Sequence, residues 1–106
     1  MSNKFILIFV TCGSKKEAHK IADALLRKRL IACANIISGV KSVFRWKGRI
    51  DKAKEFLLIL KTKRSNFKRV EKEVRRVHSY ELPEIVALPI VAGNSDYLEW
   101  IKDSVE

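Results

Sequence analysis

The chain has 106 residues, of which 47% are hydrophobic and 32% are charged, and its formal net charge is +10. This length fits one domain, 1–106, and excludes two, while the hydrophobic content suffices for a core that needs no disulfide or metal. The positive net charge is compatible with a polyanionic partner, and the high share of charged residues is compatible with a thermophilic surface.

The first predicted element is a strand over Phe5–Val10, a continuous apolar run typical of a strand buried on both faces in the middle of a sheet. This run is too short for a signal-peptide core or a membrane span. We therefore expect a cytoplasmic protein with no membrane partner, in which Cys12 and Cys33 are reduced.

A helix is predicted next, because Ser14 is followed three residues later by Glu17, the pattern of a capping box. The apolar residues behind this start recur at helical spacing, which indicates one face packed on a sheet. They are Ala18, Ile21, Ala22, Leu25 and Leu26.

Two extended segments, 30–46 and 49–62, then predict a long antiparallel hairpin, with a bend or bulge at Ser38-Gly39 and a turn at Lys47-Gly48. Fourteen residues at roughly 3.3 Å each span about 46 Å. A compact domain of this size is only about 35 Å across, so the hairpin should overshoot its own core. An overhanging edge with exposed apolar side chains is an aggregation risk, so we expect another subunit to cover it.

A second helix is predicted from near Ser65, with Phe67, Val70, Val74 and Val77 on its apolar face. Pro83 ends the helical stretch, and Ile85–Ala92 is predicted as a last strand that Pro89 confines to an edge or a bulge. A short C-terminal helix should then turn four residues inward: Tyr97, Leu98, Ile101 and Val105. This order of elements predicts an α+β fold, a ferredoxin-like sandwich with a long hairpin and an added C-terminal helix.

Two function classes find little support in the pattern. The basic stretch Lys61–Arg76 is interrupted by glutamates, so a solvated helix face is favoured over a dedicated polyanion site. Trp46 stands among basic residues but lacks the RNA-recognition signature, so packing in an interface is favoured and nucleic acid is an unfavoured partner. Neither Cys12 nor Cys33 has a motif that places a base beside it, so no enzyme is predicted.

The densest set of polar side chains lies just after the second predicted helix and comprises His78, Tyr80, Glu81 and Glu84. Imidazole and carboxylate together suit a divalent cation such as zinc or copper. A metal site needs three or four convergent donors, so Cys33 or a neighbouring subunit would have to complete it. The alternative, given equal weight, is an ordered turn in which His78 complements the helix dipole.

Several motifs, in order from Phe5 to Trp100, resemble the CutA divalent-cation tolerance family. They are Ala32–Ile36, Trp46-x-Gly48-x-Ile50, Glu55 with Lys61-Thr62, His78-x-Tyr80-Glu81-x-Pro83-Glu84-Ile85, and Pro89-Ile90 with Tyr97-Leu98-x-Trp100. The resemblance implies a cytoplasmic homotrimer of ferredoxin-like subunits, related in architecture to the PII nitrogen-signalling trimers. It also implies an association with copper and other divalent cations and no required cofactor.

The same resemblance implies a site between subunits. His78 and Glu81 would be metal donors or anchors for a polar ligand, and five further residues would form the pocket: Cys33, Trp46, Glu55, Tyr80 and Glu84. Some bacterial members of the family have a cysteine and a second histidine as further metal ligands at the positions of Val10 and Val77. His78 is therefore the only ligand of that set that this chain retains. The alternative function is a basic ferredoxin-like module that binds nucleic acid or another polyanion.

Overall fold

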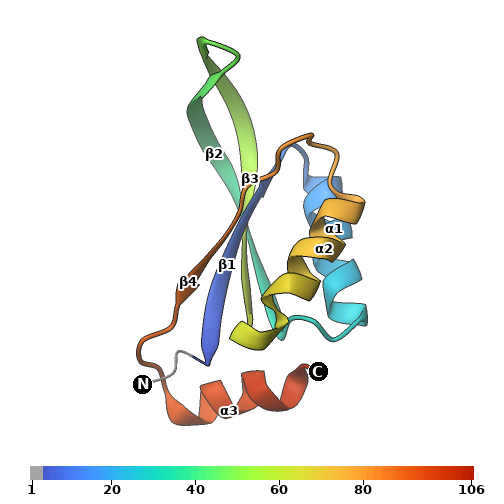
Figure 1. Ribbon diagram of the computed structural model, residues 1–106, viewed down its shortest axis with the longest axis vertical. Helices are drawn as coiled ribbons and strands as arrows, with labels where there is room; N and C mark the ends of the chain where they lie inside the picture. The colour runs from blue at the N-terminus through green and yellow to red at the C-terminus, as the bar shows by residue number, and fades with distance from the viewer. Residues whose placement is uncertain (1–3) are drawn as a thin grey trace.

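The structure is a computed structural model that describes residues 4–106. Its elements follow the predicted order (Figure 1). They are β1 (Phe5–Cys12), α1 (Lys15–Arg27), β2 (Cys33–Trp46), β3 (Arg49–Lys63), the 3₁₀ turn η1 (Arg64–Asn66), α2 (Phe67–Val77), β4 (Ile85–Pro89) and α3 (Ser95–Ser104). The α+β, ferredoxin-like prediction is therefore confirmed for these residues.

The four strands form one antiparallel sheet in the order β2-β3-β1-β4. Figure 1 shows α1 and α2 side by side on one face of this sheet, while α3 lies at the end opposite to the hairpin tip. The prediction that β1 is central is confirmed, but the prediction that both its faces are buried is wrong for a single chain. Burial alternates along β1, with Ile6, Ile8 and Val10 against the helices and their neighbours half-buried on the open face.

The core lies between the sheet and the two helices. The predicted apolar faces of α1 and α2 supply Ile21, Leu25, Val70 and Val74, all fully buried. The prediction for α3 is right only in part, because Ile101 is fully buried whereas Tyr97 is 41% exposed. Tyr97 lies instead under the Lys61 ammonium, 5.7 Å from the ring centroid.

The start of α1 positions part of the site described below. The Ser14 hydroxyl accepts a hydrogen bond from the Glu17 amide at 3.1 Å, as the capping pattern predicts. The Glu17 carboxylate does not return to Ser14, however, and accepts a hydrogen bond from the Ser79 amide at 2.6 Å. Although burial by itself would raise the pKa of Glu17, this bond lowers it, so Glu17 is an ionised anchor for the segment after α2.

The hairpin of β2 and β3 has the predicted irregularities. The pairing register shifts between Ile37 and Val40, and Gly39 takes a positive φ of 78° at this bulge. Lys47 and Gly48 both have positive φ, which is the geometry of the tight turns that match strand twist.

The hairpin also overshoots the rest of the sheet, as its length predicts. β1 pairs with β3 only as far as Cys12 opposite Phe56, whereas β2 continues to pair with β3 up to Trp46 opposite Arg49. Residues 40–55 therefore form a two-stranded arm, which we call the hairpin arm, and the molecule reaches 44 Å in its longest direction (Figure 1).

Two predicted boundaries shift. β4 ends at Pro89 and does not continue to Ala92; one bond follows it, from the Ile90 amide to the Phe5 carbonyl oxygen at 2.9 Å. β4 is an edge strand, as Pro89 predicts. The helix expected near Ser65 begins at Phe67, since η1 forms one tighter turn first.

Glu73 on α2 is a buried carboxylate held between two cations. It is 6% exposed and accepts hydrogen bonds from Lys28 Nζ at 2.9 Å and from Arg76 Nη2 at 2.6 Å. The bond from Arg76 and then the bond from Lys28 lower the pKa of Glu73 to about 2.

We expect Glu73→Gln to lower the free energy of unfolding by about 1–2 kcal/mol near neutral pH, since the exposed Lys28 and Arg76 are screened by water. The folded-state pKa lies below the ordinary 4.5, so the stabilisation is complete above that pH and is lost as pH falls towards about 2. Urea unfolding curves of the two proteins should therefore converge in acid. Glu71→Gln is the control, because Glu71 only faces Lys68 at 3.8 Å on the surface and should change stability by less than about 0.5 kcal/mol. A difference for Glu73→Gln that is constant with pH would contradict the assignment.

Candidate functional site

The segment between α2 and β4 crosses the end of β1 and is fastened there by His78. The His78 side chain is fully buried, and its Nε2 lies 2.7 Å from the Thr11 carbonyl oxygen. Since a carbonyl oxygen can only accept, Nε2 carries the proton, and Nδ1 accepts a hydrogen bond from the Tyr80 amide at 3.1 Å. Both ring nitrogens of His78 are thus engaged within the chain.

Tyr80 then reaches past the end of β1 to the hairpin. Its hydroxyl donates a hydrogen bond to Glu55 Oε2 at 2.8 Å, and Glu55 is only 7% exposed. Burial and then the Glu55 carboxylate raise the pKa of Tyr80 to about 12, so the phenol keeps its proton. Gly13 leaves room for this approach, because a Cβ there would lie 3.1 Å from the Tyr80 hydroxyl oxygen.

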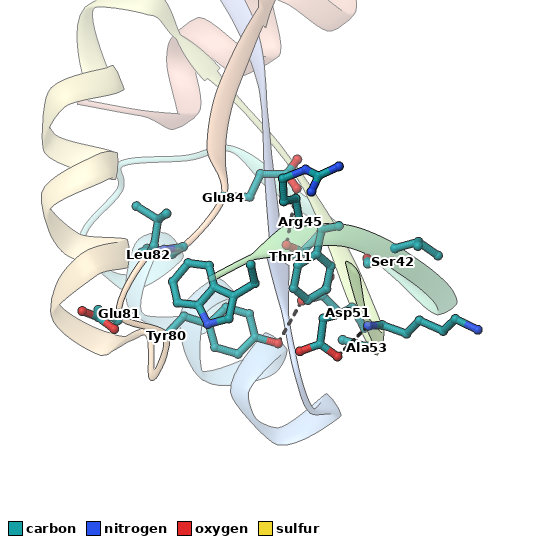
Figure 2. A pocket seen from close by; sticks show the side chains of 15 residues that line it. Thr11, Ser42, Arg45, Asp51, Ala53, Tyr80, Glu81, Leu82 and Glu84 are labelled. Atoms are coloured by element: carbon teal, nitrogen blue, oxygen red, sulfur yellow. Dashed lines mark hydrogen bonds between the residues drawn. The ribbon is translucent and has the colours of Figure 1, made fainter. Parts of the chain in front are cut away.

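A cavity of about 820 Å³ opens between this segment and the hairpin arm, along which it extends as far as Trp46; we call it the arm cavity. Figure 2 shows its two sides, with Tyr80, Glu81 and Leu82 on one and Ser42, Asp51 and Ala53 on the other. Thr11, near the end of β1, lies between these sides and donates a long hydrogen bond of 3.5 Å to Glu84. This volume is within the range of small-molecule sites, roughly 300–1,000 Å³.

The structure brings together most of the predicted site residues. Four of the five predicted pocket residues line the arm cavity, together with Glu81. They are Trp46, Glu55, Tyr80 and Glu84. Cys33 does not line it, because it stands at the far end of β2 opposite Lys61, so it could join the cavity only from another subunit. His78 lies behind the wall and positions Tyr80.

Several lining residues on β1 and on the arm were not among the predicted site residues. Thr11, Ser42, Phe44 and Asp51 line the cavity, and none of them belongs to a recognisable motif. Strand register is the signal that could have identified the arm residues. Phe44 pairs with Asp51, and two residues separate each of them from the Lys47-Gly48 turn.

The predicted metal donors do not form a complete site within one chain. Neither ring nitrogen of His78 has a free lone pair in this arrangement. Throughout residues 4–106, no three His, Cys, Asp or Glu side chains converge as a metal site requires. The metal role of His78 and Glu81 stays a prediction, which needs donors from a neighbouring subunit and a change in the bonding of His78.

The two cysteines show no sign of catalytic activation. Cys12 is fully buried and Cys33 is half-buried, and both are free. Burial raises the pKa of Cys12, which keeps it in the unreactive thiol form.

Residues 6–104 match the family model of the CutA1 divalent ion tolerance protein. The chain belongs to the CutA1 divalent ion tolerance family. The CutA protein of Archaeoglobus fulgidus is 46% identical over 99 residues, which cover 93% of this chain and 96% of that protein. The CutA protein of Thermus thermophilus is 41% identical over 98 residues, covering 92% and 95%.

Solved CutA structures share the fold. The Thermus thermophilus structure superposes with a TM-score of 0.94 at 39% identity, covering 96% of this chain and 99% of that one. The Oryza sativa CutA1 structure also gives 0.94, at 37% identity, with 99% and 98% covered. The resemblance drawn from the motifs is thereby confirmed.

The CutA relatives differ in length and in stated location. This chain spans only 54% of the chloroplastic CutA of Arabidopsis thaliana and 55% of human CutA. The Archaeoglobus fulgidus structure, with a TM-score of 0.93 at 44% identity, is named a periplasmic divalent cation tolerance protein. Within residues 4–106, no helix has the length and apolar character needed to cross a membrane.

Proposed function

We propose that this protein acts in the response to divalent cations as a homotrimeric binding protein, with one ligand pocket beside each hairpin arm. Family membership supports the role in cation tolerance. The observation that carries the rest is the overhanging arm together with the arm cavity beside it. The cytoplasmic location is part of the proposal, although one CutA relative is named periplasmic.

The arm supports assembly because a single chain leaves it uncovered. Residues 49–55 of β3 pair with β2 on one side only, so the other edge offers free backbone groups. Val43 and Ile50 on the arm are 63% and 69% exposed, and Val86 and Leu88 on the edge strand β4 are 46% and 42% exposed. Association with copies of the same chain would bury these side chains and pair the free strand edge.

The donor geometry favours an organic ligand over a coordinated metal ion. A site for zinc or copper needs at least three protein donors, and the described residues of one chain bring no such group together. The arm cavity instead combines apolar walls with a few polar groups, which is the usual make-up of small-molecule sites. Copper or another divalent cation would then act on the protein indirectly.

Equilibrium dialysis against copper or zinc tests this choice. We expect loose uptake of less than about one ion per subunit, equal in the native protein and in Glu81→Gln, because the donors do not converge. Glu99→Gln on α3 is the matched control, since Glu99 is exposed and does not line the arm cavity. One ion per subunit that is lost only in Glu81→Gln would contradict the proposal and establish direct coordination.

A second candidate rests on the charge of the helical layer. The segments 15–29 and 64–77 contain twelve lysines and arginines against four acidic residues, which is most of the net charge of +10. This surplus favours the alternative of a polyanion-binding module. That alternative predicts binding to duplex nucleic acid in a gel-shift assay that weakens about 10³-fold between roughly 50 and 200 mM salt, whereas the proposed function predicts no specific complex.

A further inference from the structure

Glu55 is a buried carboxylate that lacks a cationic partner. It is 7% exposed, nearly as buried as Glu73, yet residues 4–106 provide no lysine, arginine or histidine within ion-pair distance of it. Its Oε2 accepts the Tyr80 hydroxyl at 2.8 Å, and that is its one hydrogen bond to a side chain in this part of the molecule. A buried negative charge is costly unless a positive charge pairs with it, and Glu73 shows how this chain normally meets that need.

Tyr80 is the aromatic residue next to Glu55, and two more aromatic residues line the same cavity further along the arm. Phe44 and Trp46 from β2 and Tyr80 from the segment after α2 line the same cavity. In a single chain Phe44 and Trp46 are 39% and 36% exposed, so a ligand can reach their rings wherever a neighbouring subunit leaves the cavity open. Aromatic faces attract organic cations through the negative charge of the ring face, most strongly for tryptophan.

The charge of the lining is opposite to that of the protein. Asp51, Glu55, Glu81 and Glu84 face the arm cavity, which is four of the twelve acidic residues of the chain, against two basic residues. A cleft lined by one sign of charge raises the local concentration of the opposite ion. With Arg45 and Lys52 counted, the lining has a net charge of −2 on a protein whose net charge is +10, and this difference favours cations in the arm cavity.

We propose that the arm cavity binds a small organic cation, an ammonium or guanidinium compound, whose charge pairs with Glu55 and whose hydrocarbon part packs on Trp46 and Tyr80. This inference rests on the proposed function, because it names the ligand class of the same pocket. One carboxylate and aromatic walls are sufficient for such a cation, whereas a metal ion needs several converging donors. The volume of about 820 Å³ leaves room for a ligand well beyond a single ion.

Tryptophan fluorescence provides the test. The chain has two tryptophans, so Trp100→Phe leaves Trp46 as the reporter inside the cavity. Titration with n-butylammonium and n-butylguanidinium chlorides, at constant total salt, should change the Trp46 emission and reach saturation. The neutral n-butanol and the anionic butyrate, of similar size, should bind at least about tenfold more weakly.

Glu55→Gln in the same background should weaken binding of both cations about tenfold or more, since glutamine keeps an acceptor for Tyr80 but removes the charge. Glu99→Gln should leave the affinity unchanged. Equal binding of butanol and butylammonium, or an unchanged affinity in Glu55→Gln, would overturn the inference.

The native mass of the same samples separates this inference from the proposed function. A trimer that binds no organic cation would overturn the inference alone, while a monomer would overturn the proposed function. If Glu55→Gln instead dissociates the trimer and the probes have no effect, a cation of a neighbouring subunit occupies the cavity and the inference is also wrong.

Discussion

Replacing His78 with alanine is expected to lower the free energy of unfolding by about 2–4 kcal/mol. The change removes a fully buried ring and leaves the Thr11 carbonyl and the Tyr80 amide without their partners. Tyr80 should then move away from Glu55, so the arm cavity loses one wall. Urea unfolding at a fixed protein concentration measures the first effect, because the stability of an assembled protein depends on concentration.

His19→Ala is the matched control for this prediction. His19 is exposed on α1, so its removal should change stability by less than about 0.5 kcal/mol. If His78 were only a metal ligand, His78→Ala would leave the metal-free protein as stable as the native one and reduce only the stabilisation by added metal. That result would contradict the positioning role that the two hydrogen bonds assign to His78.

Shortening the hairpin arm is expected to convert the proposed trimer into a folded monomer. Deletion of Val43–Trp46 and Arg49–Lys52 places the Lys47-Gly48 turn between Ser42 and Ala53. These two residues are cross-strand partners, and their side chains lie on the same face of the hairpin as those of Trp46 and Arg49. The core contains none of the deleted residues, so the rest of the fold should form. Binding in the arm cavity should be lost as well, because Phe44, Trp46 and Asp51 are removed.

Sedimentation equilibrium measures this change in assembly, and circular dichroism shows whether the shortened chain is folded. Lys47→Asn is the control, since it keeps the arm length and asparagine tolerates the positive φ that lysine adopts there. A shortened chain that is folded and still trimeric would show that the arm does not hold the assembly together.

The elements of the fold could be predicted because their signals are local. Ser14 begins α1, Gly39 permits the bulge, and Lys47-Gly48 forms the turn, each through the conformation of one or two residues. The errors arise where the environment decides. The open face of β1 is half-buried because no helix covers it in a single chain, and local hydrophobicity cannot reveal which face remains uncovered.

The candidate site was predictable in its residue types but not in its bonding. Tyr80 and Glu55 were both expected in a pocket, yet they are 25 positions apart, and their hydrogen bond depends on how the segment after α2 crosses the end of β1. The bonding of His78 could not be read from the sequence either, because its partner Thr11 lies 67 positions away. Such contacts follow from the packing of whole elements, which no local motif encodes.

Native mass spectrometry of the purified protein, with and without added copper and zinc, tests the central claim most directly. We expect one species at three times the chain mass of 12.2 kDa, whose metal uptake is loose and without fixed stoichiometry. A monomer would contradict the argument from the hairpin arm, and a trimer with a fixed number of ions per subunit would contradict the preference for an organic ligand.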